Sequence, residues 1–360
     1  MLPVMPTALA CASLLALSFS PLLGQEVDPR VTAIDLALTA AESEGLCGVV
    51  LLRSQDRVLL HSAYGFADQE KKRPMTTSTG FDIGSLVKPI TAVAILKLEE
   101  EGILSTSDSL GDFFGDLPAD KSGITLMEIL THTSGMREIF GSDYDVVSRE
   151  WVFEKAMSAA LLGPPGEEER YSNSGYSILA MVIEDITGRP YEAYVREAVL
   201  EPAEAEGIGY VMAGWENEDL AVGYRASGTR FGTPLDHPWA EDGPSWNLRG
   251  NGGMLATAEQ MARWYEALFD GKILGAEALE EYYSFAAGES RSAGGKALAH
   301  AGGNGVFNTL QISWIDHDVH MTFFTSCAAR TAEGTWRRFR DELISLAKRE
   351  PDTAYTDGAN

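Results

Sequence analysis

The first apolar pattern after residue 24 has the period of a helix. Four apolar residues recur at intervals of three and four: Val31, Ile34, Leu38 and Ala41. This spacing places them on one face of an α-helix. We therefore expect an amphipathic helix over residues 30–42.

Strand-like runs lie near both ends of the chain. Residues 47–52 and 58–64 are joined by the polar link RSQDR, which predicts a hairpin. Three later runs have the same character and predict successive antiparallel strands: 298–302, 309–315 and 319–327. Four apolar residues at helical spacing then predict a final helix: Trp336, Phe339, Leu343 and Leu346.

The middle of the chain reads as helices with irregular connections. Residues 85–102 form an apolar run that ends at a glycine, and 174–187 form another that is stopped by Gly188 and Pro190. Two capping boxes predict further helix starts: Thr125 with Glu128, and Thr257 with Gln260. Residues 207–253, rich in Gly, Pro and Trp, predict long loops with short strands.

Strands at both ends around a helical middle predict an α+β fold. We expect one discontinuous domain over 25–350, in which an antiparallel sheet is flanked by N- and C-terminal helices. Its sheet part is expected at about 30–86 and 251–349, with a helical and loop insertion at about 87–250. The tail 351–360 is polar and expected to fray.

The first 24 residues carry no charged side chain and end in small and turn-forming residues. The stretch is short for a membrane span, so we interpret 1–24 as a secretory signal peptide cut near Gly24. Its start lacks the usual Lys or Arg, and Leu22 is bulky for its position before the cut. Cys11 offers lipid attachment as an alternative, but it stands early and more apolar residues follow it. We expect a periplasmic or secreted protein with no stable membrane insertion after the leader is removed.

Composition limits the kinds of partner that the protein can bind. The 360 residues include 53 Asp and Glu against 28 Lys and Arg, a formal net charge of −25, with no basic run. This excludes a nucleic-acid partner and disfavours an anionic membrane surface. The three cysteines show no metal-binding spacing, and no HExxH occurs. His317 and His320 could bind a metal, but a solvated turn is the favoured interpretation, so we expect no metal and no cofactor.

The strongest chemical signal is FDIGSLVKPITAVAILKLEEEG. Ser85 opens a helix and Lys88 follows one turn later on the same face. Backbone N–H groups at a helix start can stabilise an oxyanion, and a desolvated lysine can act as a base. S-x-x-K also occurs at Ser345 and Lys348, late in the predicted final helix, where a solvated face is the simpler interpretation. For Ser85 an ordinary helix cap remains the alternative.

Two further short motifs supply support. Tyr171-Ser172-Asn173 stands in the turn before a helix, where a phenol near cations can have a lowered pKa and an amide can hold a substrate. His300, Gly302 and Gly303 end a strand-like run. There the Gly303 amide could face an oxyanion, and His300 could supply positive charge or a hydrogen bond. Taken singly, a surface turn and a glycine turn are the simpler interpretations.

In this order, Ser85-x-x-Lys88, Tyr171-x-Asn173 and His300-x-Gly302 resemble the active-site triplet of the serine β-lactamase and penicillin-binding-protein superfamily. Tyr-x-Asn resembles the class C branch, with its D-alanyl-D-alanine carboxypeptidases, D-aminopeptidases and esterases. Three other segments fit that branch: 64–85, LTHTSGM at 130–136, and NGGMLATAEQMARW at 251–264. The resemblance covers about 30–347 and implies an active site between the sheet and the helical insertion.

The resemblance implies a role for each residue of the triplet. Ser85 would be the acylated nucleophile, Lys88 would help deprotonate it, and Tyr171 would be the shared general base and acid. Asn173 would hold the substrate amide. His300 would stand where many relatives have Lys, tuning Tyr171 or meeting a substrate carboxylate.

The resemblance also implies roles for two glycines and a contact between two cysteines. The backbone N–H groups of Ser85 and Gly303 would form the oxyanion hole, with Gly302 beside the substrate. The first and last strands would be neighbours, which would bring Cys47 and Cys327 together and allow a disulfide in an exported protein.

These motifs predict an exported serine hydrolase that forms a Ser85 acyl-enzyme with an ester, an amide or a D-amino-acid peptide bond. The substrate would be a small molecule or a peptide. A third motif of His-Ala-Gly in place of Lys-Thr/Ser-Gly, with the charge of −25, disfavours efficient β-lactam hydrolysis. The alternative is a penicillin-recognising sensor of the same fold that acylates with little or no turnover.

Overall fold

The computed structural model describes residues 29–43, 45–54, 57–225, 227–237, 243–286 and 297–326. Several predicted features lie outside these ranges: the leader, the final helix, the polar tail and Cys327. The disulfide between Cys47 and Cys327 therefore stays a prediction.

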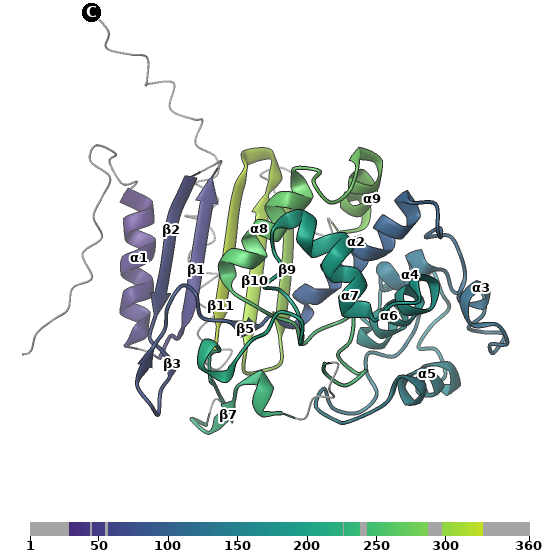
Figure 1. Ribbon diagram of the computed structural model, residues 1–360, viewed down its shortest axis with the longest axis horizontal. Helices are drawn as coiled ribbons and strands as arrows, with labels where there is room; N and C mark the ends of the chain where they lie inside the picture. The colour runs from purple at the N-terminus through teal and green to yellow at the C-terminus, as the bar shows by residue number, and fades with distance from the viewer. Residues whose placement is uncertain are drawn as a thin grey trace, which may run out of the picture.

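Strands gather near the two ends of the described chain, and most of the helices lie in between (Figure 1). The α-helices are α1 (Pro29–Glu42), α2 (Val87–Glu100), α3 (Leu110–Phe114), α4 (Leu126–Leu130), α5 (Arg149–Ser158), α6 (Asn173–Thr187), α7 (Tyr191–Val195), α8 (Ala258–Phe269) and α9 (Ala276–Ala286). The longer strands are β1 (Gly48–Ser54), β2 (Arg57–Tyr64), β9 (Ala297–Gly303), β10 (Asn308–Trp314) and β11 (Val319–Thr325). The short strands are β3 (Phe66–Asp68), β4 (Arg73–Pro74), β5 (Phe81–Asp82), β6 (Gly223–Tyr224), β7 (Arg230–Gly232) and β8 (Leu255–Ala256). Single turns are the 3-10 turns η1 (Gly84–Leu86), η3 (Glu201–Ala203), η4 (Asn217–Asp219), η5 (Pro234–Asp236) and η6 (Ile315–His317), and the π turn η2 (Arg196–Leu200).

The longer strands form one antiparallel sheet in the order β2-β1-β11-β10-β9. The predicted hairpin is the pair β1 and β2, and the three late strands pair in succession. β1 also pairs with β11, with Gly48 opposite Thr325, so strands from the two ends of the chain are neighbours. The predicted α+β class with an antiparallel sheet is therefore confirmed.

The two faces of the sheet are buried against different partners. Val50 and Leu52 of β1 pack in one apolar cluster with the buried face of α1, which confirms the predicted amphipathic helix. Their neighbours Val49 and Leu51 point to the other face, because side chains alternate along a strand. They pack in a larger cluster with α8, which crosses this face of the sheet, and with the helices that Figure 1 shows beyond β9.

The helical part supplies the rigid elements behind the site. α2 is buried along most of its length and packs against α6 and α9. Both predicted capping boxes are present, at the starts of α4 and α8. α6 ends as predicted at Gly188, whose φ of 64° is a left-handed cap that glycine adopts without strain. These elements fix the positions of Ser85 and Asn173, which stand at the beginnings of two of the packed helices.

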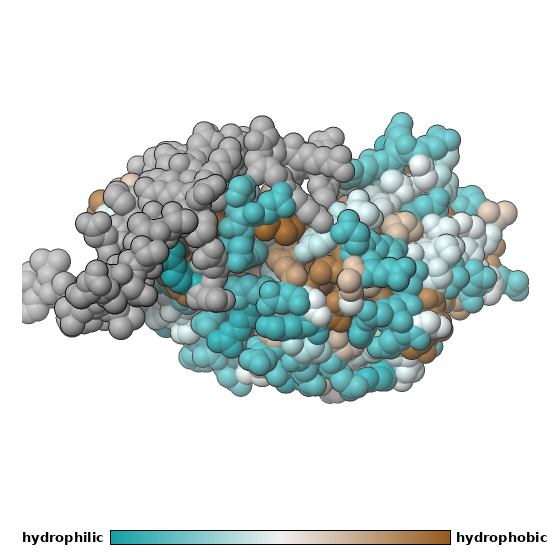
Figure 2. Space-filling model, turned by 90° about the horizontal axis from the view of Figure 1, so that it is seen from above, coloured by the Kyte–Doolittle hydropathy of each residue, from teal (hydrophilic) through white to brown (hydrophobic). Residues whose placement is uncertain are grey.

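In the face seen from above, polar residues cover most of the described surface, and apolar residues gather in a central band (Figure 2). Within the described ranges, no helix is long and apolar enough to cross a membrane.

Candidate active site

Ser85 is presented by a sharp turn between β5 and α2. Gly84, just before it, has a φ of 52°, which favours glycine, and a Cβ there would lie 2.5 Å from the amide nitrogen of Gly303. Ser85 lies in η1, which runs directly into α2, so its amide belongs to the first turn of a continuous helical segment. Amides at that position have no partner within the helix. The turn therefore brings a hydroxyl and a backbone N–H together at the end of β9.

Lys88 lies one turn into the helix and contacts Ser85 directly. Its Nζ is 3.1 Å from Ser85 Oγ and donates to the carbonyl oxygen of Asn251 at 2.9 Å. The side chain is buried, and burial lowers the pKa of Lys88 to about 7, although the nearby Asp143 and Glu138 carboxylates oppose the shift. An amine with this pKa is substantially neutral near pH 7, so it can accept a proton.

Tyr171 completes the contact around the hydroxyl. Its phenol donates a hydrogen bond to Ser85 Oγ at 2.7 Å, and Lys88 Nζ lies 4.8 Å from the centre of its ring. The sequence allowed a lowered pKa here, and that expectation is wrong. Burial raises the pKa of Tyr171, with a further rise from Glu138 and Asp143, which outweighs the hydrogen bond to Ser85. The phenol is therefore protonated at neutral pH, and Lys88 is the better base.

His132 packs against Tyr171, a role that the sequence motifs did not predict. Its ring centre lies 4.6 Å from that of Tyr171, and its Nδ1 accepts the backbone N–H of Ser172 at 3.1 Å. Its carbonyl oxygen accepts the N–H of Arg170 at 2.7 Å. Burial, with the adjacent Lys88, lowers the pKa of His132 to about 4. The neutral imidazole therefore holds Ser172 and contacts the ring of Tyr171, while the backbone carbonyl of His132 holds Arg170.

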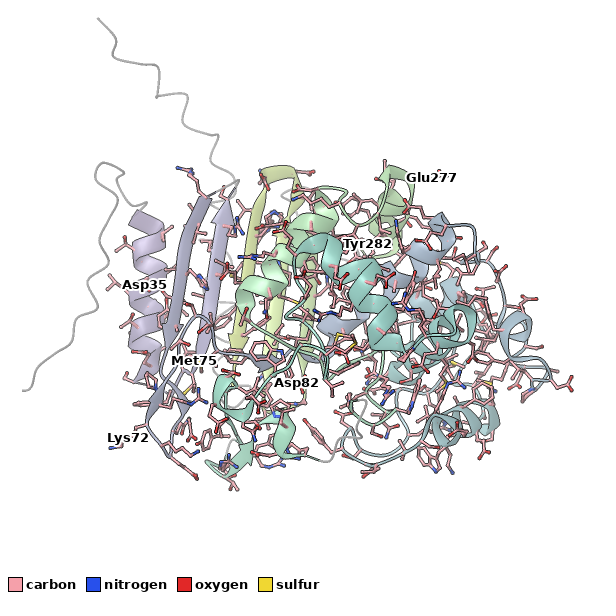
Figure 3. All side chains as sticks on the ribbon, viewed as in Figure 1. Asp35, Lys72, Met75, Asp82, Glu277 and Tyr282 are labelled. Carbon is pink, nitrogen blue, oxygen red and sulfur yellow. The ribbon has the colours of Figure 1, made fainter. Side chains whose placement is uncertain are left out.

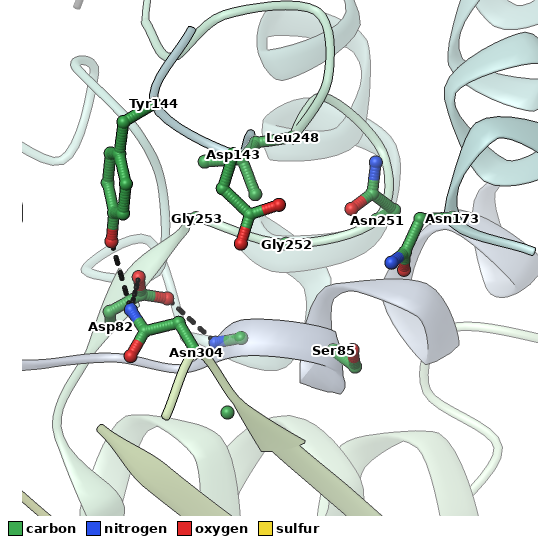
Figure 4. Close-up of a pocket in the computed structure, with 12 residues that line it drawn as sticks. Asp82, Ser85, Asp143, Tyr144, Asn173, Leu248, Asn251, Gly252, Gly253 and Asn304 are labelled. Atoms are coloured by element: carbon green, nitrogen blue, oxygen red, sulfur yellow. Dashed lines mark hydrogen bonds between the residues drawn. The ribbon is translucent and has the colours of Figure 1, made fainter. Parts of the chain in front are cut away.

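A cavity opens beside Ser85, with Asn173 on its wall (Figure 4). It is lined by the turn of β5 and η1, the 143–144 loop, the start of α6, the 248–253 turn and the end of β9. Asn251 also belongs to this wall, and its side-chain Nδ2 donates to Ser177 Oγ and to the Asn247 carbonyl. The structure thus brings together Ser85, Lys88, Tyr171 and Asn173 from separate parts of the chain.

His300 lies in β9, in the predicted strand, but its ring contacts α8. Its Nδ1 lies 3.0 Å from the hydroxyl of Tyr265 on α8, and the two rings stack with centres 5.8 Å apart. Burial lowers the pKa of His300 to about 4. The positive charge that the sequence allowed is therefore absent at neutral pH. His300 is also not among the residues that line the cavity.

The glycines at the end of β9 approach the Ser85 turn closely. A Cβ at Gly302 would lie 2.8 Å from the amide nitrogen of Ser85 and would overlap the Ile83 carbonyl oxygen. Gly303 lines the cavity. Only a residue without a side chain fits at Gly302, which lets β9 and η1 place their backbones side by side.

The cavity carries more negative charge than the motifs indicated. The Asp143 carboxylate points into it (Figure 4), and burial raises the pKa of Asp143, partly offset by Lys88. Asp82 lines the cavity floor and is buried. Within the described ranges, no group of three or more His, Cys, Asp or Glu side chains could hold a metal ion.

Residues missed by the sequence reasoning divide into two kinds. His132 and Asn251 lie in LTHTSGM and NGGML, segments that fit the resemblance, so a signal existed but assigned no contact. Asp143 lies in an irregular loop with no motif, and only the fold brings it to Ser85.

The sequence is similar to those of known proteins. The sequence profile of the β-lactamase family matches residues 36–335. Penicillin-binding protein 4* of Bacillus subtilis (strain 168) is 25% identical over 355 residues, covering 88% of this chain and 71% of that protein.

Solved structures are similar over most of the chain. EstCE1, described as a hydrolase with promiscuous acyltransferase activity, matches with a TM-score of 0.72 at 21% identity, covering 89% of this chain and 98% of that one. The D-amino acid amidase of Ochrobactrum anthropi SV3, complexed with L-phenylalanine, matches with a TM-score of 0.70 at 19% identity, with coverages of 89% and 98%. These likenesses confirm the predicted fold.

Proposed function

The chain belongs to the β-lactamase family, and from that premise we propose that it is an exported serine hydrolase that forms an acyl-enzyme on Ser85. The substrate is a small molecule or peptide with an ester, amide or D-amino-acid peptide bond. The observation that carries the proposal is the pair of short contacts that Lys88 Nζ and the Tyr171 hydroxyl make with Ser85 Oγ, at 3.1 and 2.7 Å.

Acylation begins with neutral Lys88. Its amine takes the proton of Ser85 as Oγ attacks the carbonyl carbon, and its 2.9 Å hydrogen bond to the Asn251 carbonyl fixes its direction. The negative charge that develops on the carbonyl oxygen is met by the backbone N–H groups of Ser85 and Gly303. Asn173 holds the substrate's amide, where it has one, on the cavity wall.

Tyr171 carries the proton to the leaving group. Its phenol is protonated at neutral pH and lies within hydrogen-bond distance of Oγ, and part of the residue is open to solvent. It donates its proton to the departing oxygen or nitrogen, and protonated Lys88 returns a proton to the phenolate through a water molecule. In deacylation the same groups act in reverse on an attacking water. His300 is kept in this proposal only as a residue that positions β9 through Tyr265.

Four probes separate turnover from labelling alone. The mature protein and Ser85→Ala are incubated with a fluorophosphonate, a fluorescent penicillin, a chromogenic cephalosporin and a p-nitrophenyl ester. Turnover of the ester that depends on Ser85 supports the hydrolase. Stable labelling of Ser85 with no turnover of any substrate supports the sensor instead, and labelling that survives Ser85→Ala rejects both.

Substitution of the phenol tests its role as a proton carrier. Tyr171→Phe keeps the ring against His132 but removes the hydroxyl, so we expect kcat for an amide substrate to fall by about 10²-fold or more, with a smaller fall for the p-nitrophenyl ester. KM should change little. Because p-nitrophenolate leaves without a proton, the loss should be larger for an amide with a poor leaving group. Equal losses for both substrates would contradict proton delivery by Tyr171. Tyr283→Phe, on α9, is the control and should keep wild-type rates.

Substrate charge should matter because of Asp143. With a carboxylate directed into the cavity, an ester that bears an amine should react faster than a matched ester that bears a carboxylate, by about tenfold at low salt. Asp143→Asn should reduce this preference. It should also move the rising limb of the pH–rate profile to lower pH, because Asp143 raises the pKa of Lys88. An unchanged ratio of the two rates, measured at pH 8, would show that Asp143 does not face the substrate.

The wider context is also proposed. The uncharged, apolar first 24 residues support export to the periplasm or beyond. A single catalytic domain is proposed over 25–350, with the sheet part and the insertion bounded as the sequence pattern predicts. No nucleic-acid partner and no cofactor are included in the proposal.

A further inference from the structure

A buried carboxylate and a carboxamide join the two strands that border the cavity. Asp82 ends β5, two residues before Gly84 and three before Ser85, and its side chain is 4% exposed. Figure 3 shows it near the end of the sheet. Asn304 directly follows Gly303, the last residue of β9. Each side chain therefore belongs to a segment that carries one of the two proposed oxyanion donors.

In each hydrogen bond of the pair, the donor and the acceptor are defined by the chemistry of the groups (Figure 4). The backbone N–H of Gly84 donates to Asp82 Oδ1 at 2.8 Å, and Asn304 Nδ2 donates to Asp82 Oδ2 at 3.1 Å. The same Nδ2 donates to the Tyr144 hydroxyl at 3.0 Å. At its other end, Asn304 Oδ1 accepts the backbone N–H groups of Val306 and Phe307 at 3.1 and 3.0 Å.

This network constrains the turn and the strand end together. A carboxylate with little solvent exposure is costly to bury unless its hydrogen bonds replace those of water. Asp82 accepts hydrogen bonds from the amide of Gly84, whose φ is positive, and from the side chain of Asn304. Asn304 is itself held by the turn that connects β9 and β10. These hydrogen bonds therefore link the backbone at Gly84 to the backbone at the end of β9.

We propose that Asp82 and Asn304 are a positioning pair that sets the relative placement of the Ser85 and Gly303 backbone N–H groups, and so the stabilisation of the tetrahedral intermediate. The inference rests on the proposed function. Neither residue exchanges a proton with substrate; both act through the backbone groups that they hold.

The direction of the hydrogen bonds permits a reciprocal substitution. Asp82→Asn alone replaces one of the two acceptor oxygens by an NH₂ group, so either Asn304 or Gly84 loses its acceptor. Asn304→Asp alone sets two carboxylates against each other. The double variant Asp82→Asn/Asn304→Asp restores a donor and an acceptor, because the new amide can donate to the new carboxylate. The Val306 and Phe307 amides still find acceptors, the Tyr144 hydroxyl can donate, and the carbonyl oxygen left at position 82 accepts from Gly84 and from Gly253, whose backbone also bonds Asp82.

The test measures kcat and KM for a p-nitrophenyl ester and the affinity of a boronic acid that mimics the tetrahedral intermediate. Each single substitution should lower kcat by about tenfold or more, since loss of one oxyanion donor costs about 10²–10³-fold. Boronate affinity should fall in parallel, with KM little changed. The double variant should return both to within about threefold of wild type, as expected for coupled neighbours.

A matched control separates positioning from general stability. Asp68 is 3% exposed, accepts the Tyr224 hydroxyl and the Lys71 N–H, and is not among the residues that line the cavity. Asp68→Asn should lower Tm and leave kcat unchanged. All variants are checked for folding by circular dichroism and thermal melting.

The outcomes are distinct. Single variants that are folded and retain wild-type kcat and boronate affinity overturn the inference, as does a folded double variant with no recovery. Ester turnover by the wild type that survives Ser85→Ala overturns the proposed function and this inference together. Turnover that depends on Ser85 but is indifferent to both single substitutions overturns this inference alone.

Discussion

Replacing Ser85 with alanine is expected to lower kcat for ester hydrolysis by at least about 10⁴-fold. The substitution removes the oxygen that both Lys88 Nζ and the Tyr171 hydroxyl contact, so no acyl-enzyme can form. Because Ser85 is only partly buried and its side chain supplies no helix cap, Tm should change by no more than a few degrees. The release of p-nitrophenol from a p-nitrophenyl ester measures kcat, and thermal melting measures Tm.

The control for Ser85 is an exposed serine far from the cavity. Ser43 follows α1, and its hydroxyl donates only to the carbonyl of Ala40. Ser43→Ala should keep wild-type kcat and KM. A folded Ser85→Ala protein that keeps more than about 10% of wild-type kcat would mean that another residue is the nucleophile.

Lys88→Met is expected to produce the second largest loss, about 10³- to 10⁴-fold in kcat/KM. Methionine fills a similar volume without a base, so the buried site keeps its packing while Ser85 loses its proton acceptor. In the wild type, kcat/KM should rise with pH and level off above about 7, because only neutral Lys88 accepts a proton and burial lowers its pKa to about 7. Below that pH the protonated amine is inactive. The rising limb should be absent from the residual activity of the variant.

Lys97 provides the matched control on the same helix. It pairs with Glu100 at 2.7 Å near the end of α2, away from the cavity. Lys97→Met should leave both the rate and the pH profile unchanged. A Lys88→Met protein with an unaltered rising limb near pH 7 would assign that limb to a different group.

Much of the fold was predictable from local pattern. The continuous apolar run Val49–Leu52, the helical period of α1 and the capping boxes of α4 and α8 each depend on neighbouring residues, and each predicted element is confirmed. The order of the triplet motifs also predicted that Ser85, Lys88, Tyr171 and Asn173 would meet, although their spacing alone is weak.

The electrostatics of the site were not predictable in the same way. A pKa depends on burial and on charges that the fold brings from distant segments. Tyr171 lies near Lys88 as expected, yet its pKa is raised, because burial and the carboxylates of Glu138 and Asp143 outweigh its hydrogen bond to Ser85. His300 occupies the predicted strand, but its neighbour is Tyr265, which is 35 residues away in sequence and carries no motif.

The acyl-enzyme itself is the most direct test of the account. The protein is mixed with a fluorophosphonate and, separately, with an ester that deacylates slowly, then quenched and measured by intact-mass and peptide mass spectrometry. The account predicts one added acyl or phosphonyl group per chain, located on the peptide that contains Ser85 and absent from Ser85→Ala. An adduct on any other residue, or one of equal yield in Ser85→Ala, would contradict it.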